Sequence, residues 1–144
     1  MKNSGDLMRL CPCHSGIPYT SCCEPYHKGT PAPTAESLMR SRYAAYALHL
    51  VDYIISTTHP DNPSNAIPHD EWKRDILRFS QETSFDGLTI LFVEQKENSA
   101  YVSFTAKLRR GNSNISFTER SFFVKKGGLW LYHSGVIQAS NQRI

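Results

Sequence analysis

The residues of this sequence that are best suited to chemistry are its cysteines. All four lie within thirteen residues near the N-terminus, at Cys11, Cys13, Cys22 and Cys23. The 121 residues that follow contain none. Four thiolates at the corners of a tetrahedron form a closed structural site for a metal such as Zn2+. The eight intervening residues include Gly16 and Pro18, which favour a turn that brings the two cysteine pairs together. We therefore expect a metal site in this segment.

Two disulfide bonds are the alternative use of four cysteines. A bridge between adjacent cysteines, or across a single residue, requires strained geometry. Cross-bridges are typical of secreted chains, whereas Met1–Leu10 has no apolar run that would indicate a secretory signal peptide. No stretch of the sequence approaches the roughly 18 apolar residues that cross a bilayer. We therefore expect a cytoplasmic protein that does not associate with membranes.

The cysteine spacing resembles the SEC-C motif, the short metal-binding knuckle in the C-terminal tail of the SecA translocase ATPase. That motif runs C-x-C-x-S-G, then five residues, then C-C or C-H, and the matching residues are Cys11, Cys13, Ser15, Gly16, Cys22 and Cys23. The resemblance implies that the four cysteines bind Zn2+. It also implies a docking role, because the SecA tail recognises the SecB chaperone and contacts the ribosome. His14, at a position where glycine is usual, and His27 are reserve metal ligands on chemical grounds alone.

Beyond the cysteines, the hydrophobic pattern predicts helices followed by strands. A proline-rich linker is expected over residues 24–33, and apolar residues at three- and four-residue steps predict a long helix over residues 35–57, capped by Thr34. A second helix is expected over residues 71–82, capped by Asp70. The period then changes to two, which predicts antiparallel strands over 88–93, 101–108, 117–124 and 129–133. This order indicates an α+β fold with the long helix on one face of the sheet.

Three segments resemble the YchJ family of uncharacterised bacterial proteins. They are A-P-T-A-E-S-L-M-R-S-R-Y-A-A-Y-A-L-H-L-V-D-Y-I-I-S-T-T-H-P at 32–60, F-T-E-R-S-F-F-V at 117–124 and G-L-W-L-Y-H-S-G at 128–135. The resemblance implies a small SEC-C zinc knuckle over residues 1–28 and a nuclear-transport-factor-2-like (cystatin-like) domain over residues 34–138. In that fold a curved antiparallel sheet wraps around a long helix and a second helix, forming a cone that often holds a pocket. Relatives with this fold often form homodimers through the sheet, so a homodimer is also expected here.

The polar residues expected to face the inside of the cone form a candidate pocket: Arg42, Tyr46, Asp52, His59, Glu119 and Trp130. Arg42 and Glu119 are expected to pair across the contact between helix and sheet, because a buried guanidinium requires a partner. Asp52 and His59 are an acid–base candidate only if the helix continues to His59. The sequence contains no G-x-S-x-G, phosphate-binding loop or H-E-x-x-H motif. It therefore favours a protein without catalysis of its own and identifies no reaction.

These observations predict a zinc-binding accessory or interaction protein whose knuckle docks a protein or ribosomal partner. A shell of four thiolates leaves no position open for a catalytic water, so the metal is expected to be structural. The alternative is a small-molecule site, binding or enzymatic, in the cone. A third interpretation is contact with RNA or the ribosome, because the net charge is +3 and its excess lies in the last third of the chain. The basic residues near the expected turns there are Arg109, Arg110, Lys125 and Lys126.

Overall fold

The computed structural model of this chain describes residues 9–138. Its N-terminal part contains the 3-10 helix η1 (Tyr19–Ser21) and the short helix α2 (Glu24–His27). The helices that follow are α3 (Ala35–Ala47), α4 (Val51–Ser56), the 3-10 helix η2 (Pro63–Ala66) and α5 (His69–Glu82). The strands are β1 (Ser84–Gln95), β2 (Ser99–Arg110), β3 (Ser113–Asn114), β4 (Phe117–Lys126) and β5 (Leu129–Ile137).

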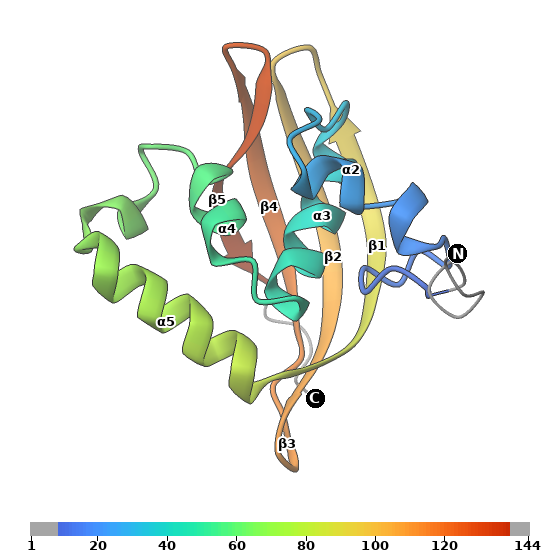
Figure 1. Cartoon of the computed structure of the whole chain (residues 1–144). Helices are drawn as coiled ribbons and strands as arrows, with labels where there is room; N and C mark the ends of the chain where they lie inside the picture. Colours follow the sequence, from blue (N-terminus) through green and yellow to red (C-terminus); the bar gives the residue numbers. More distant parts are fainter. Residues whose placement is uncertain (1–8, 139–144) are drawn as a thin grey trace.

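The strands form one antiparallel sheet, which confirms the predicted α+β class. Their order is β1-β2-β4-β5, and the two-residue β3 pairs with the end of β2. Figure 1 shows a curved sheet with α3 and α4 on one face, α5 to one side, and the N-terminal segment beside β1. Register shifts between Phe85 and Gly87 and between Ile90 and Phe92 interrupt the β1–β2 ladder. Such bulges bend a strand locally, so they contribute to the curvature.

All four predicted strands are present, and each is longer than the pattern indicated. On β2, alternate residues from Ala100 to Leu108 are buried, and they pack against Leu38, Met39 and Tyr43 of α3. The alternate residues of β4 that the period-two pattern placed together share this inner face: Phe117, Glu119, Ser121 and Phe123. The inner face of the sheet is therefore one wall of the cone, and α3 lies against it.

The predicted long helix is broken into α3 and α4, so this part of the prediction was wrong. His49 has a left-handed backbone with φ of 64°. The backbone N–H of Leu50 donates to the carbonyl of Ala45 at 2.8 Å, and the N–H of His49 donates to the carbonyl of Tyr46 at 3.2 Å. These are the two hydrogen bonds of a Schellman motif, which ends a helix. The apolar spacing continues across the break, so periodicity alone did not reveal it.

The other helix boundaries agree in part with the sequence. Thr34 caps α3 as predicted: its Oγ1 accepts from the N–H of Ser37 at 3.0 Å, and Ser37 Oγ accepts from the N–H of Thr34 at 3.1 Å. Asp70 does not cap α5, because the helix follows Pro68 directly and Asp70 lies inside its first turn. The linker predicted over residues 24–33 contains the short helix α2.

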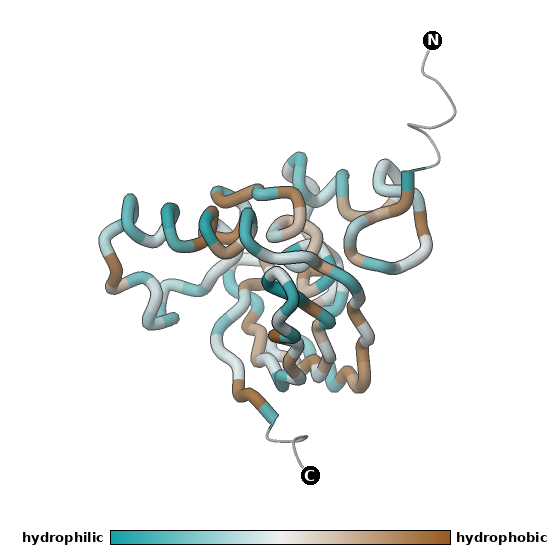
Figure 2. The backbone as a smooth tube through the Cα atoms, turned by 90° about the horizontal axis from the view of Figure 1, so that it is seen from below, coloured by the Kyte–Doolittle hydropathy of each residue, from teal (hydrophilic) through white to brown (hydrophobic). Residues whose placement is uncertain are grey.

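The surface of the fold is polar along α5 and apolar on parts of the outer strands. Figure 2 shows most of α5 as hydrophilic, and the buried residues of this helix are Trp72, Ile76 and Ser80. Among residues 9–138, no helix has the length and apolar character that crossing a membrane requires. Exposed apolar side chains occur on β1 and β5, at Leu91, Phe92, Val136 and Ile137. The homodimer through the sheet stays a prediction.

Candidate metal centre and cone cavity

The four cysteines predicted as metal ligands come together in the structure. Their sulfur atoms all lie within 4.8 Å of one another. The Sγ atoms of Cys13 and Cys22 are 3.6 Å apart, and those of Cys22 and Cys23 are 3.9 Å apart. None of the four cysteines forms a disulfide bond, and all but Cys22 are buried. This cysteine cage (Cys11, Cys13, Cys22 and Cys23) can therefore hold a metal ion with ligands from one short segment.

A tight turn brings the two cysteine pairs together. The N–H of Cys11 donates to the carbonyl of Ile17 at 2.9 Å, which closes the loop between them. Within this loop, His14 and Gly16 have left-handed backbones with φ of 64° and 83°. Glycine adopts this conformation without steric cost, so the turn predicted from Gly16 is confirmed. His14 adopts the same conformation at the position where the SEC-C motif usually has a glycine.

Proximity shifts the acidity of the thiols in opposite directions. Hydrogen bonds from Cys11 and Cys23 strongly lower the pKa of Cys13. The hydrogen bond to Cys13 raises the pKa of Cys11 to about 12, and hydrogen bonds to Cys11 and Cys13 raise the pKa of Cys23. The sulfur of Cys13 therefore carries negative charge more readily than those of Cys11 and Cys23. Binding of a metal ion by all four requires the release of the remaining thiol protons.

The two histidines near the cysteine cage connect it to the rest of the protein. His27 Nδ1 accepts from the Tyr19 hydroxyl at 2.7 Å, and His27 Nε2 donates to the carbonyl of Ser41 in α3 at 2.8 Å, a tautomer assigned from these partners. Burial lowers the pKa of His27, which favours this neutral form. His14 Nε2 lies 3.0 Å from the carbonyl of Phe85 in β1. Both nitrogens of His27 therefore have hydrogen-bonding partners in the protein, so neither is directed at the cysteine cage.

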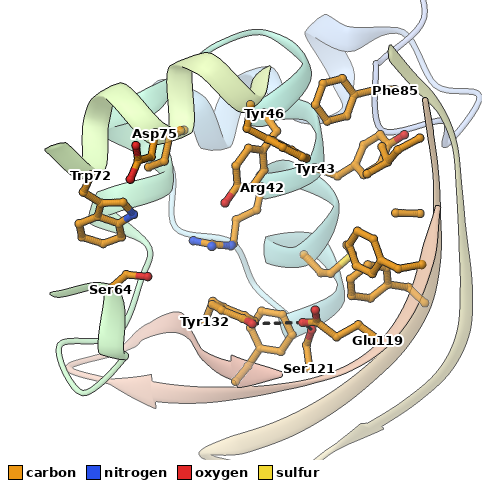
Figure 3. Close-up of a pocket in the computed structure, with 18 of the residues that line it drawn as sticks. Arg42, Tyr43, Tyr46, Ser64, Trp72, Asp75, Phe85, Glu119, Ser121 and Tyr132 are labelled. Carbon is orange, nitrogen blue, oxygen red and sulfur yellow. Dashed lines mark hydrogen bonds between the residues drawn. The ribbon is translucent and has the colours of Figure 1, made fainter. Parts of the chain in front are cut away.

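The cone encloses a cavity of about 490 Å³ between α3, η2, α5 and the inner face of the sheet (Figure 3). Most of its lining is apolar, and its aromatic residues are Tyr43, Tyr46, Trp72, Phe79, Phe85, Phe104, Phe117, Phe123 and Tyr132. The polar and charged lining residues are Arg42, Ser64, Asp75, Glu119 and Ser121. Cavities of this size, with an apolar wall and a few polar groups, are typical of small-molecule sites.

Arg42 is a buried cation in the wall of this cavity. Only 8% of its surface is exposed. Its Nη1 group donates to the carbonyl of Ile54 at 3.0 Å and to the hydroxyl groups of Thr57 and Thr58 at 2.7 and 3.1 Å. The guanidinium also lies over the ring of Tyr132, with Cζ 4.7 Å from the ring centroid. Desolvation lowers the pKa of Arg42, but an arginine side chain keeps its charge in a protein.

Glu119 lies on the opposite wall and does not pair with Arg42, so the predicted ion pair was wrong. Among residues 9–138, no ion pair joins these two side chains. Glu119 Oε2 accepts from Ser121 Oγ at 2.6 Å and from the Tyr132 hydroxyl at 3.1 Å (Figure 3). Tyr132 therefore lies between the two charges. Burial and the charge of Glu119 raise the pKa of Tyr132, so its hydroxyl keeps its proton and donates.

Three of the six predicted pocket residues line the cavity: Arg42, Tyr46 and Glu119. Asp52 does not, because its side chain is 87% exposed and pairs with Lys73 at 3.2 Å. His59 lies outside the cavity, where its Nδ1 accepts from the N–H of Asp61 at 3.0 Å. Trp130 is buried in the core cluster against the sheet and also lies outside the cavity. The acid–base pair of Asp52 and His59 is not formed, because α4 ends at Ser56, before His59, and Asp52 points to solvent.

The cavity-lining residues that were not in the predicted pocket come mainly from η2, α5 and the late strands. Trp72, Ile76 and Phe79 lie at helical spacing on α5, within the second predicted helix, and their side chains form part of the cavity wall. Their spacing of four and three residues is the sequence feature that indicates a common inward face. Ser64 in η2 had no comparable pattern, since it lies in a segment predicted as loop. Tyr132 was on a predicted strand, but its contact with Glu119 depends on the pairing of β4 with β5.

Two of the basic residues predicted at hairpin turns have acidic partners. Arg109 Nε lies 2.6 Å from the carboxylate of Asp86, and Arg110 Nε lies 3.9 Å from that of Glu82. These exposed pairs reduce the local positive charge that a nucleic-acid surface requires. Contact with RNA or the ribosome stays a prediction.

Comparison with known proteins connects this architecture to a family. The family model of the YchJ middle nuclear-transport-factor-2-like domain matches residues 34–135. A UPF0225 protein of Serratia proteamaculans is 41% identical over 136 residues, which cover 90% of this chain and 84% of that protein. A UPF0225 protein of Actinobacillus succinogenes is 36% identical over 141 residues, covering 95% of this chain and 88% of that protein.

Solved structures extend the likeness to the N-terminal segment. A SEC-C motif containing protein from Rhodopseudomonas palustris has a TM-score of 0.76 and 38% identity, covering 88% of this chain and 96% of that one. Another SEC-C motif containing protein, from Psychrobacter arcticus, has a TM-score of 0.73 and 26% identity, covering 95% of this chain and 87% of that one. A putative Ca/calmodulin-dependent kinase II association domain from Exiguobacterium sibiricum shares the fold alone, with a TM-score of 0.56 and 12% identity over 79% of this chain and 98% of that one. The chain therefore belongs to the YchJ (UPF0225) family, in which a SEC-C-type cysteine motif precedes a nuclear-transport-factor-2-like domain.

Proposed function

We propose that the protein is a cytoplasmic zinc-binding accessory protein whose N-terminal knuckle docks a protein partner. The observation that carries the proposal is the convergence of four cysteine sulfurs within 4.8 Å. A tetrahedral site with Zn–S bonds of about 2.3 Å has sulfur–sulfur edges of about 3.8 Å. The separations of 3.6 Å and 3.9 Å around Cys22 are close to this value. Free thiols are also what a reducing compartment maintains.

The role of Zn2+ in this proposal is structural. Four thiolates complete its coordination, so no position remains for a substrate or a catalytic water. The cysteine cage packs on Ala44 of α3, and Arg40 Nη1 donates to the carbonyl of Cys13 at 3.3 Å. A metal ion here would supply the folding free energy that this short segment lacks and would hold it in place against α3.

The knuckle also presents an apolar surface suited to a partner. Leu10 and Ile17, on either side of the loop that carries Cys11 and Cys13, are 58% and 45% exposed. The backbone bridge between Leu10 and Pro18 brings the segments of these two residues together, and exposed apolar patches often mark protein interfaces. We therefore propose that the partner is a protein segment that inserts apolar side chains against Leu10 and Ile17. The docking role of the SecA tail agrees with this proposal by analogy only.

Affinity capture with matched variants tests the docking role. The double variant Leu10→Ser/Ile17→Ser removes the apolar pair without touching the cysteines. Leu129→Ser is the control, because Leu129 is 48% exposed but starts β5, far along the chain from the knuckle. We expect a partner that the wild type and Leu129→Ser capture and that both the double variant and Cys22→Ser/Cys23→Ser lose. Equal capture by all four proteins would contradict docking through the knuckle.

A second candidate function is binding of a small molecule in the cone. The observation in its favour is the cavity of about 490 Å³, which the aromatic side chains line but do not fill. Ala106→Phe places a ring in this cavity from β2. We expect native mass spectrometry of wild-type protein to show a bound small molecule that the Ala106→Phe variant lacks. If the folded variant retains that molecule, the molecule is bound elsewhere and this candidate fails.

A further inference from the structure

We propose that the cone cavity selects a small amphipathic monocarboxylate, with the carboxylate at Arg42 and the apolar body among the aromatic side chains. This inference rests on the second candidate function, binding of a small molecule in the cone, and adds the chemical class of the ligand. The observation behind it is the buried guanidinium of Arg42, which has no carboxylate within ion-pair distance among residues 9–138.

The hydrogen bonds of Arg42 leave two of its three guanidinium nitrogens, Nε and Nη2, without a partner among residues 9–138. The three acceptors of Arg42 are neutral, and all of them contact Nη1. Within residues 9–138 the structure gives Nε and Nη2 no acceptor, and no carboxylate lies within ion-pair distance of the side chain. Burying an unpaired charge is costly. A guanidinium fork with free N–H groups matches the two oxygens of a carboxylate.

The free edge of Arg42 faces open space. Arg42 lines the main cavity and also an adjoining one of about 410 Å³ that shares Ser64 and Tyr132 with it. Figure 3 shows the guanidinium pointing into the space between Trp72, Ser64 and Tyr132. An anion that enters this space can therefore reach the unpaired N–H groups directly.

The other charges in the cavity limit the ligand to one negative charge. Glu119 is a carboxylate on the opposite wall, and its Oε2 already accepts from Ser121 and Tyr132. Asp75 adds a second carboxylate to the lining, and its one ion pair within residues 9–138 is with Arg78, at 3.7 Å. A dicarboxylate or a phosphate dianion would place its second charge near these acids. A single carboxylate instead supplies the counter-ion that Arg42 lacks.

The remaining wall determines the body of the ligand. Beyond Arg42, the lining consists mainly of aromatic rings from α3, α5, β1, β2 and β4, with aliphatic side chains such as Met39, Ile76 and Leu108 between them. Such a wall accommodates an aryl group or a short alkyl chain and offers few donors for a sugar or a peptide backbone. Aryl-alkyl carboxylates are therefore the simplest members of the proposed class.

Calorimetric titration of full-length protein with phenylbutyrate and with its neutral amide, phenylbutyramide, tests the proposal at pH 7. We expect the wild type to bind the carboxylate at least about tenfold more tightly than the amide, as a charge-assisted hydrogen bond to a buried guanidinium implies. Arg42→Met is expected to bind both compounds equally. Arg74→Met, which removes an exposed charge on α5 outside the cavity, is expected to keep the wild-type preference. Ala106→Phe is expected to bind neither compound.

The outcomes separate this inference from the function on which it rests. If the wild type binds phenylbutyramide as tightly as phenylbutyrate, the proposed ligand class is wrong, although the cavity still binds a small molecule. If the wild type binds neither compound and native mass spectrometry shows no bound molecule, both proposals fail. The ratio between acid and amide in the wild type decides the question even if Arg42→Met does not fold.

Discussion

Replacement of His27 by alanine tests how the knuckle is attached to α3. The imidazole accepts from the Tyr19 hydroxyl at 2.7 Å and donates to the carbonyl of Ser41 at 2.8 Å. Tyr19 is buried, so the variant leaves its hydroxyl without this partner, and the Ser41 carbonyl loses the imidazole but keeps its hydrogen bond within α3. Each unsatisfied group costs about 1–3 kcal/mol. Because His27 is half-buried and water can replace part of the loss, we expect the free energy of unfolding to fall by about 2–4 kcal/mol in total.

Urea denaturation followed by fluorescence measures this change. His69→Ala is the control, because His69 is exposed in the first turn of α5, and we expect it to change stability by less than about 0.5 kcal/mol. The zinc content gives a second readout: His27→Ala is expected to keep its metal, since His27 is not a ligand. If His27→Ala loses zinc, or if it is as stable as His69→Ala, then His27 does not attach the knuckle to α3 in this way.

Two further predictions follow from the backbone and from burial. His49→Gly removes a side chain from a left-handed residue at the end of α3. We therefore expect the free energy of unfolding, measured by urea denaturation, to rise by about 0.5–1 kcal/mol. A decrease would show that the His49 side chain is stabilising. Burial lowers the folded-state pKa of His27 below its ordinary value of 6.5, so the unfolded state binds the proton more tightly. The free energy of unfolding should therefore fall as the pH drops below about 6.5, and His27 contributes at most about 1.4 kcal/mol per pH unit to this fall. In His27→Ala the free energy of unfolding should fall less steeply with pH, as urea denaturation at several pH values would show.

Much of the fold was predictable because its signals are local. The capping box needs only Thr34 and Ser37, three residues apart. The four strands follow from alternation, which groups alternate side chains of β4 on one face, although it does not decide which face is the inner one. The cysteine cage also follows from spacing, because a turn at Gly16 is enough to bring the two pairs together.

The cavity was less predictable because it depends on contacts between distant segments. The break at His49 reorients α4, and this changes Asp52 from a pocket candidate to an exposed partner of Lys73. The break needs a left-handed histidine, and a sequence pattern that favours helix throughout does not reveal it. Likewise, Tyr132 separates Arg42 from Glu119 only because β5 pairs beside β4.

Binding of one zinc ion by the four cysteine thiolates is the basis of the proposed docking role. Metal analysis by inductively coupled plasma mass spectrometry, on reduced full-length protein prepared without added zinc, tests it most directly. We expect one zinc ion per chain in the wild type and in His27→Ala, and almost none in Cys22→Ser/Cys23→Ser. Folded wild-type protein without zinc, or a double cysteine variant that keeps it, would contradict the account.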